Sequence, residues 1–221
     1  PSGCGKSTLL KMVAGLLDPT DGRLLLWRKP VDQLDASGRK IAFVFQAPTL
    51  MPWASVQANV RLPLDLAGVS RAEAEPRVAE ALATVGLAKF ANALPRALSG
   101  GMQMRVSIAR GLVVQPQLLL MDEPFGALDE ITRHKLDADL LQLWAEKKLT
   151  VVFVTHSIHE AVFLSTRVVM MAARPGRIVE EFHIDEPYPR KPEFMVSPRF
   201  ADYASQLQRS LMRASETQGE E

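Results

Sequence analysis

The chain has 221 residues, 47% of them hydrophobic and 23% charged, and its 26 basic and 25 acidic side chains leave a formal net charge of +1. This composition is that of an ordinary globular protein and excludes a disordered chain. The near-neutral balance does not indicate a basic nucleic-acid-binding surface, so we expect no nucleic-acid partner. The single cysteine, Cys4, cannot form an internal disulfide, and the apolar runs are too short to span a bilayer.

The first part of the chain predicts a helix, two strands and a helical region, in that order. The helix is expected over 6–17, and the strands over 23–27 and 41–46. From about 49 to 98 the apolar spacing is helical and predicts no strand, with 71–85 as the clearest helix. We therefore expect a helical subdomain inserted between two strands of a sheet.

The second part alternates strands with helices, which is typical of an α/β fold. Several strands are apolar throughout, as in strands buried on both faces of a parallel sheet. The last two strands flank Arg174-Pro175-Gly176, a turn sequence that predicts a hairpin at the sheet's edge. The expected elements are helices over 101–114 and 130–148, strands over 118–122, 150–155, 167–172 and 177–182, an extended segment over 186–199, and a helix over 197–214.

The chain opens on a glycine-rich sequence, Pro1-Ser2-Gly3-Cys4-Gly5-Lys6-Ser7-Thr8, directly before the first expected helix. Its Gly-Lys-Ser matches the end of the phosphate-binding loop, whose first glycine would lie just ahead of this sequence. Glycines let backbone N–H groups face phosphate oxygens, and the helix N-terminus adds positive charge. Alone, the sequence would also fit a serine-capped turn. The residues expected to bind nucleotide are Ser2, Gly3, Cys4, Gly5, Lys6, Ser7 and Thr8, with Lys6 at the β- and γ-phosphates and Ser7 on Mg²⁺.

The apolar strand over 118–122 leads into two carboxylates, Asp122 and Glu123. Ligands bind at the carboxyl ends of such strands, so Asp122 is placed to hold Mg²⁺ through water. Glu123 is placed to act as general base on the attacking water. Solvated carboxylates are common at strand ends, but their combination with a phosphate loop is much less common.

A second glycine-rich helix start, Leu98-Ser99-Gly100-Gly101-Met102-Gln103, lies between these motifs. Ser99 is a suitable N-cap, and Gly100 and Gly101 expose backbone N–H groups that can bind an anion. Alone, this sequence would indicate only a capped helix. With the other two motifs it resembles the LSGGQ signature of ATP-binding cassette (ABC) ATPases, with Met102 in place of the glutamine.

The resemblance implies roles for further residues in chain order. Gln46 is similar to the Q-loop glutamine, which touches Mg²⁺ and water, and Asp129 resembles the D-loop residue that passes across a dimer. His156 resembles the switch histidine at the γ-phosphate, whereas His134, His159 and His183 match no motif. The implied catalytic residues are Glu123, His156, Gln46 and Lys6, and the implied magnesium ligands are Ser7, Gln46 and Asp122.

The resemblance covers nearly the whole chain and implies a P-loop NTPase fold with a mostly parallel core sheet. It implies one ATPase domain over 1–221, a helical subdomain over 49–98 plus the signature helix 99–115, and a C-terminal extension over 183–221. The sequence DEPFGALD over 122–129 is similar to that of bacterial type I importers. The sequence Arg174-Pro175-Gly176-Arg177-Ile178 is similar to the nitrate, sulfonate and taurine importer subgroup, to which pyrimidine-precursor importers also belong.

The family's activity implies ATP and Mg²⁺ as cofactors, and ATP bound between two copies, expected to be identical, arranged head to tail. Hydrolysis would then drive integral membrane permease subunits, supplied by a periplasmic solute-binding protein, from the cytoplasmic face of the inner membrane. The apolar segment 49–53, after Gln46, is a candidate docking site for the permease. Met51 and Trp53 could equally pack inside the insert.

Two other functions stay open on the sequence. One is an ABC ATPase outside transport, which usually carries a second cassette, a coiled-coil insertion or basic patches. The other is a regulatory subunit with decayed ATPase activity, against which the intact Lys6, Asp122, Glu123 and His156 argue. The resemblance also leads us to expect that the natural chain carries about 35–50 residues ahead of Pro1, so that the N-terminal strands are missing here. The transported substrate does not follow from the sequence.

Overall fold

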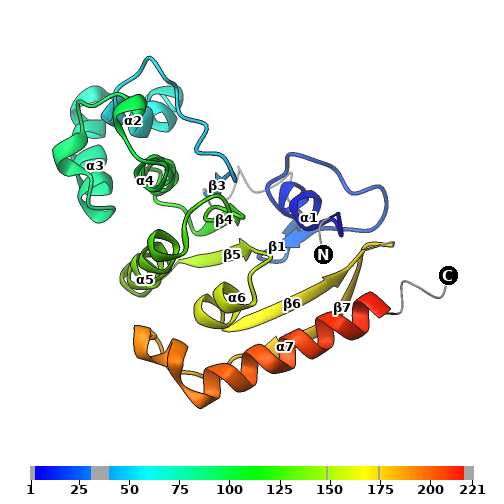
Figure 1. Ribbon diagram of the computed structural model, residues 1–221. Helices are drawn as coiled ribbons and strands as arrows, with labels where there is room; N and C mark the ends of the chain where they lie inside the picture. The colour runs from blue at the N-terminus through cyan, green and yellow to red at the C-terminus, as the bar shows by residue number, and fades with distance from the viewer. Residues whose placement is uncertain (1–2, 31–39, 148, 174, 217–221) are drawn as a thin grey trace.

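The computed structural model describes residues 3–30, 40–147, 149–173 and 175–216 (Figure 1). The helices are α1 (Lys6–Val13), α2 (Val56–Leu66), α3 (Arg71–Thr84), α4 (Gly100–Leu112), α5 (Glu130–Lys147), α6 (Ile158–Leu164) and α7 (Pro198–Glu216). Short 3-10 helices are η3 (Ala88–Phe90), η4 (Pro95–Ala97) and η5 (Pro192–Val196). The strands are β1 (Leu25–Leu26), β2 (Lys29–Pro30), β3 (Ile41–Val44), β4 (Leu118–Asp122), β5 (Thr150–Val154), β6 (Arg167–Ala172) and β7 (Arg177–His183). None of the described helices is long and apolar enough to cross a membrane.

The core sheet is parallel and has the order β3-β4-β5, which confirms the predicted α/β fold. The central strand β4 is apolar, and four of its five residues are buried. Val44 of β3 lies opposite Met121, and Asp122 lies opposite Val154 of β5. Because the three strands run in the same direction, their carboxyl ends meet at one edge, where the loops carrying Gln46, Glu123 and His156 begin.

The insert between β3 and β4 is helical, as expected, since none of residues 49–98 lies in a strand. Helix α4 follows the insert and has two apolar faces. Val106 and Ala109 are buried against α2 and α3, whereas Met104 and Ile108 are buried in the cluster that covers the core sheet and α5. The signature helix therefore joins the insert, at the upper left of Figure 1, to the core sheet.

The strand expected over 23–27 is shorter than predicted, since only Leu25–Leu26 forms a strand there. Strands β1 and β2 instead form a two-stranded antiparallel ribbon in which Leu26 lies opposite Lys29. The two residues between them, Trp27 and Arg28, have φ of 51° and 64°, which is the backbone of a type I′ hairpin turn. Neither is a usual residue for that turn, so no sequence pattern predicted it.

Helix α1 ends at Val13, four residues before the expected end. Gly15, with φ of 70°, terminates it in a Schellman motif. The N–H of Gly15 donates to the carbonyl of Met12, and that of Leu16 donates to the carbonyl of Lys11, both at 2.9 Å. The helix therefore ends at the left-handed Gly15 and does not continue to the Asp18-Pro19 sequence.

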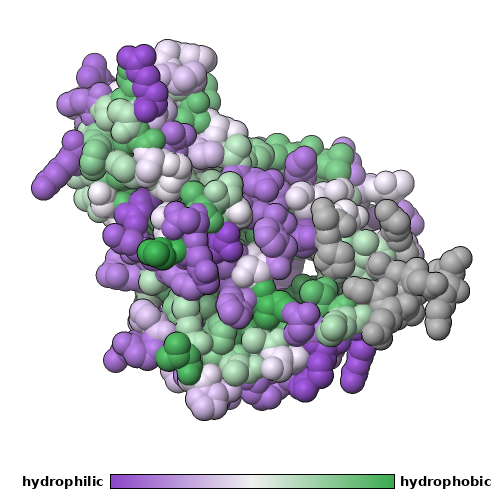
Figure 2. All heavy atoms as spheres, in the orientation of Figure 1, coloured by the Kyte–Doolittle hydropathy of each residue, from purple (hydrophilic) through white to green (hydrophobic). Residues whose placement is uncertain are grey.

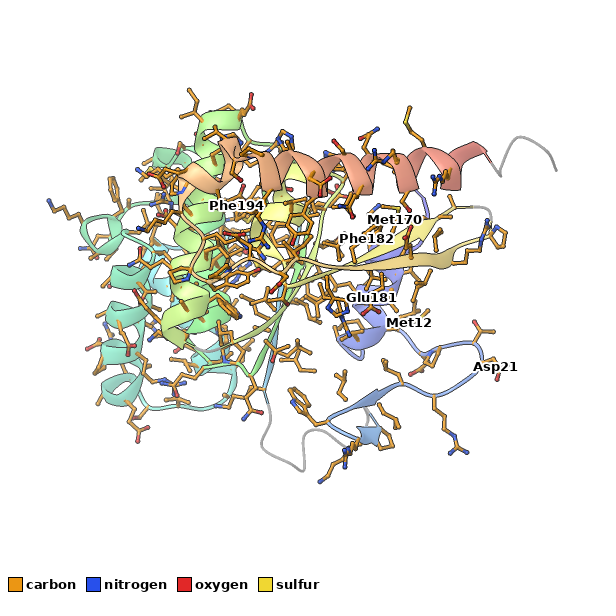
Figure 3. All side chains as sticks on the ribbon, turned by 90° about the horizontal axis from the view of Figure 1, so that it is seen from below. Met12, Asp21, Met170, Glu181, Phe182 and Phe194 are labelled. Atoms are coloured by element: carbon orange, nitrogen blue, oxygen red, sulfur yellow. The ribbon has the colours of Figure 1, made fainter. Side chains whose placement is uncertain are left out.

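The hairpin expected at the sheet's edge forms, but it makes a separate two-stranded sheet of β6 and β7. Arg174, which belongs to the turn sequence between the two strands, lies outside the described residues. Met170 and Phe182 pack in one apolar cluster with Phe194 of η5 and Leu207 of α7. Figure 3 shows α7 lying along this hairpin, so the apolar face of the hairpin is covered by helix rather than extending the core sheet.

Two segments of the C-terminal third differ from the expectation. Helix α6 has only seven residues and was not predicted, although Ser157 caps it by accepting from the N–H of Glu160 at 3.3 Å. The segment 186–199, expected to be extended, contains η5, whose Phe194 stacks edge-on against Phe200 with centroids 5.2 Å apart. Helix α7 agrees with the prediction to within two residues at its end.

Candidate functional site

The phosphate loop folds as its glycines require. Gly3 and Gly5 have φ of 78° and 93°, values that side chains other than glycine rarely adopt, and Gly5 is the N-cap of α1. Cys4 is buried between them, and its Sγ accepts from the Nζ of Lys6 at 3.6 Å. Ser2 lies outside the described residues, and Thr8 is exposed on the first turn of α1. The helix N-terminus is thus presented together with the Lys6 ammonium.

The turn between β6 and β7 packs against the phosphate loop. A Cβ placed on Gly176 would lie 2.7 Å from the carbonyl oxygen of Cys4, so only glycine fits without a shift of the backbone. Gly176 belongs to the turn sequence that favoured the importer subgroup. Its contact with the phosphate loop had no signal in the sequence, because it joins segments about 170 residues apart.

Ser7 and Asp122 meet at the end of β4. The Ser7 hydroxyl donates to Asp122 Oδ1 at 2.9 Å, although 115 residues separate them in the sequence. Hydroxyl and carboxylate oxygens are the donors that Mg²⁺ prefers, and Mg²⁺ commonly keeps only one or two protein ligands beside phosphate oxygens and water. The pair therefore fits the predicted magnesium role. Gln46 is exposed two residues beyond β3 and is not part of this contact.

Glu123 is the centre of a second set of contacts. Its Oε1 lies 3.9 Å from the Nζ of Lys6, and its Oε2 lies 3.1 Å from Nδ1 of His156. Glu123 has φ of 45°, in the left-handed region that is unfavourable for this residue, and its N–H donates to the carbonyl of Val154 at 2.9 Å. Such strain persists where the surroundings hold it in place, and it often marks functional sites.

His156 closes this cluster from the end of β5. Its ring is 59% exposed, so it is open to a ligand from solution. A Cβ on Gly126 would lie 3.6 Å from Cε1 of His156 and 3.4 Å from the Glu123 carbonyl oxygen, which leaves little room there for a larger residue. The structure thus brings together five of the predicted residues: Lys6, Ser7, Asp122, Glu123 and His156.

The signature residues lie elsewhere in this chain, at the start of α4. Ser99 caps the helix by accepting from the N–H of Met102 at 3.3 Å, and Ser99 and Gly100 are exposed. Gly101 is buried against the start of α5, where a Cβ would lie 2.8 Å from Cγ2 of Thr132. Its lack of a side chain is therefore required by packing within the chain, independently of any nucleotide.

Asp129 caps α5. Its Oδ1 accepts from the N–H of Thr132 at 2.9 Å, and this hydrogen bond lowers the pKa of the exposed Asp129 carboxyl. The cap keeps Asp129 ionised at the surface.

The loop after Gln46 is held by α4. The guanidinium of Arg110 donates to the carbonyls of Pro48 and Thr49 at 2.8 and 2.9 Å and to the Thr49 hydroxyl at 2.8 Å. Its partial burial lowers the pKa of Arg110. Trp53, four residues further, is 78% exposed, so it does not pack inside the insert. Figure 2 shows that apolar and polar side chains are interspersed over the visible face of the insert, at the upper left.

A buried polar group behind His156 was missed by the sequence reasoning. Asp137 of α5 and Glu160 of α6 are only 1% and 5% exposed, and Arg133 lies beside them. Their burial depends on how α5 packs on α6 and has no local signal, although Ser157 and Glu160 have the spacing of a capping box.

Comparisons with known proteins identify the family to which the chain is similar. The sequence model of the ABC transporter family matches residues 1–126. The taurine import ATP-binding protein TauB of Rhizobium johnstonii is 45% identical over 222 residues, covering 97% of this chain and 82% of that protein. TauB of Pseudomonas entomophila is 47% identical over 185 residues, covering 84% and 70%. Among solved structures, CbiO1 from Clostridium perfringens, part of the ABC transporter complex CbiONQ, is similar with a TM-score of 0.76 and 28% identity, covering 94% of this chain and 84% of that one.

These matches extend over most of the chain, and the family model, over residues 1–126, includes the glycine-rich loop and the Asp122–Glu123 pair. In the structure Lys6, Ser7, Asp122 and Glu123 lie close together at the carboxyl edge of the parallel sheet. The chain is therefore an ATP-binding ATPase subunit that belongs to the ABC transporter family.

Proposed function

We propose that this ATPase powers the import of a small solute, in the class of taurine and other sulfonates, nitrate or pyrimidine precursors. The observation that carries the proposal is the cluster of Lys6, Glu123 and His156 beside the Ser7–Asp122 contact, which is suited to hydrolysis of a nucleoside triphosphate. The similarity to proteins named as taurine import subunits supports the import direction and the solute class.

In this proposal Glu123 is the general base. A water molecule attacks the γ-phosphorus of ATP while Glu123 takes a proton from that water, and ADP leaves with the electrons of the broken P–O bond. Lys6 binds the β- and γ-phosphate oxygens, and His156, 3.1 Å from Glu123, orients the reacting groups at the γ-phosphate. When bound, Mg²⁺ would neutralise charge at the phosphates, and Ser7, Asp122 and Gln46 are the residues that would hold it.

We further propose that two identical chains bind ATP head to tail. Ser99 and Gly100 are exposed at a helix N-terminus, where backbone N–H groups can bind a phosphate, and they lie outside the Glu123 cluster of their own chain. Ser99, Gly100 and Gly101 would complete the site of the other copy, with Asp129 passing across the interface. ATP then holds the dimer closed, and hydrolysis lets it open.

The permease is proposed to dock beside the Q-loop. Trp53 is exposed there, and hydrogen bonds from Arg110 connect this loop to the signature helix. Movement of the docked permease would therefore reach the helix start that faces ATP. In this proposal the chain works at the cytoplasmic face of the inner membrane, and a periplasmic solute-binding protein delivers the solute on the other side.

The test is reconstitution of the chain with its permease and binding protein in vesicles. Taurine, an alkanesulfonate, nitrate and a pyrimidine precursor are added in turn, and ATP hydrolysis and solute uptake are measured. One of these solutes should stimulate hydrolysis and be accumulated. Stimulation by none of them would contradict the proposed solute class, and export would contradict the direction.

The docking site is tested with Trp53→Ala. This change should abolish solute-stimulated hydrolysis and leave the basal ATPase rate unchanged. Leu66→Ala is the matched control, because Leu66 is also in the insert and is 80% exposed. Loss of basal activity in the Trp53 variant, or normal coupling, would contradict docking at this residue.

A further inference from the structure

A buried polar network lies behind the loop that carries His156. It consists of Arg133 and Asp137 from α5, Thr155 directly after β5, and Glu160 from α6. Asp137 and Glu160 are 1% and 5% exposed, and buried carboxyl groups are costly to an apolar interior unless they make specific contacts. Packing alone does not explain why two carboxyl groups are buried next to the loop that carries His156.

Glu160 contacts the residues on both sides of His156. Its Oε2 accepts a hydrogen bond from the hydroxyl of Thr155, and the same hydroxyl oxygen accepts from the N–H of Ser157 at 2.9 Å. The N–H of Glu160 in turn donates to the Ser157 hydroxyl at 3.3 Å. In a capping box the side chain of this glutamate would return to the N-cap N–H, but here it reaches past the cap to Thr155. The His156 backbone is thus held from both neighbours.

Arg133 joins the same network to the D-loop. Its Nε lies 3.8 Å from Oε1 of Glu160, and its Nη2 donates to the carbonyl of Leu128, the residue before Asp129, at 3.0 Å. Burial raises the pKa of Glu160. The pKa of Asp137 is raised to about 8, mainly by burial and to a smaller extent by the nearby charge of Glu160. Asp137 therefore keeps its proton at neutral pH, and Arg133 balances the charge of Glu160.

We propose that Glu160 is a positioning residue for ATP hydrolysis, which fixes the His156 loop through Thr155 and, with Arg133, ties that loop to the D-loop. The inference rests on the proposed role of His156. Glu160 touches no reacting group itself, so its removal should lower the rate of hydrolysis without weakening the binding of ATP, which depends on the phosphate loop.

Paired substitutions distinguish this role from packing. Thr155→Val keeps the shape of the side chain and removes the hydroxyl, whereas Thr155→Ser keeps the hydroxyl and removes a methyl group. We expect Thr155→Val to lower kcat about 10- to 100-fold, as small displacements of a positioned group do, with KM for ATP unchanged within about twofold. Thr155→Ser should keep kcat within about threefold of the unaltered protein.

Glu160 is tested in the same way. Glu160→Gln retains an oxygen that can accept from Thr155 and should keep most of kcat, whereas Glu160→Ala should lose it. Asp139→Ala is the control, since Asp139 pairs with Arg105 on the exposed side of α5 and should leave kcat unchanged. If Glu160→Ala does not fold, the Thr155 pair decides the question, because both Thr155 variants keep Arg133 beside the Glu160 carboxylate.

The outcomes distinguish a failure of the proposed role of His156 from a failure of the positioning role of Glu160. A His156→Ala variant that hydrolyses ATP at the original rate would contradict the proposed function of His156. An inactive His156→Ala variant together with normal kcat in Thr155→Val would overturn the positioning role alone. A loss in Thr155→Ser as large as that in Thr155→Val would also overturn it, because the hydroxyl that Thr155→Ser retains would then not be enough to preserve the rate.

Discussion

Asp137→Asn is the substitution whose effect on stability follows most directly from the structure. Asp137 lies on the buried side of α5 with 1% of its surface exposed, and one of its carboxyl oxygens has no hydrogen-bond partner among the described residues. Burial raises the pKa of this carboxyl from 3.8 to about 8. Asparagine has the same shape as the protonated acid and never ionises.

The sign and size of the effect follow from proton linkage. Between the two pKa values the folded protein keeps the Asp137 proton while the unfolded chain has lost it, so the free energy of unfolding falls as pH rises. The slope is about 1.4 kcal/mol per pH unit, which gives about 2.7 kcal/mol between pH 5 and pH 7. Burial also raises the pKa of Glu160, but that group is present in both proteins and its contribution largely cancels in their difference.

The assay is urea unfolding of both proteins at pH 5, 6 and 7, with the free energies extrapolated to water. The stability of Asp137→Asn relative to the original protein should increase by about 1.4 kcal/mol with each pH unit. The same measurement on Asp139→Asn, at an exposed position of the same helix, should give a constant difference. A constant difference for Asp137→Asn as well would refute the argument that this carboxyl is buried and protonated.

Three further substitutions test the phosphate loop, the turn that packs against it, and the packing at the start of α4. Lys6→Ala should weaken ATP binding about 10- to 100-fold in equilibrium titration, since a charged hydrogen bond to phosphate is lost, and unchanged affinity would contradict the role of Lys6. Gly101→Ala places a Cβ 2.8 Å from Cγ2 of Thr132 and should lower the free energy of unfolding by about 1–3 kcal/mol, an effect that adding Thr132→Ser should relieve if overpacking is the cause. Gly176→Ala forces the turn away from the Cys4 carbonyl and should raise Kd for ATP, whereas an unchanged Kd would show that this contact does not shape the loop.

The parts of the site that could be predicted are those with a local cause. A phosphate loop needs glycines at fixed positions before a helix, and Gly3 and Gly5 do adopt positive φ. Carboxylates that follow a buried strand must lie at its carboxyl end, which is where Asp122 and Glu123 are found. Parallel pairing of β3, β4 and β5 then brings His156 beside Glu123.

The parts that could not be predicted depend on tertiary packing. The turn at Trp27 and Arg28 has a backbone that those residues do not favour, so no sequence pattern indicated it. The burial of Asp137 and Glu160 is a property of how α5 meets α6, and the sequence shows only two ordinary acidic residues there. The contact of Gly176 with Cys4 likewise joins distant segments.

The central claim is that Glu123 removes the proton from the water that attacks ATP. The most direct measurement compares ATP binding and single-turnover hydrolysis in Glu123→Gln and in the original protein. We expect Glu123→Gln to bind MgATP with similar affinity and to hydrolyse it about 10²- to 10⁴-fold more slowly, as the loss of a general base requires. Hydrolysis by this variant at the original rate would contradict the assignment.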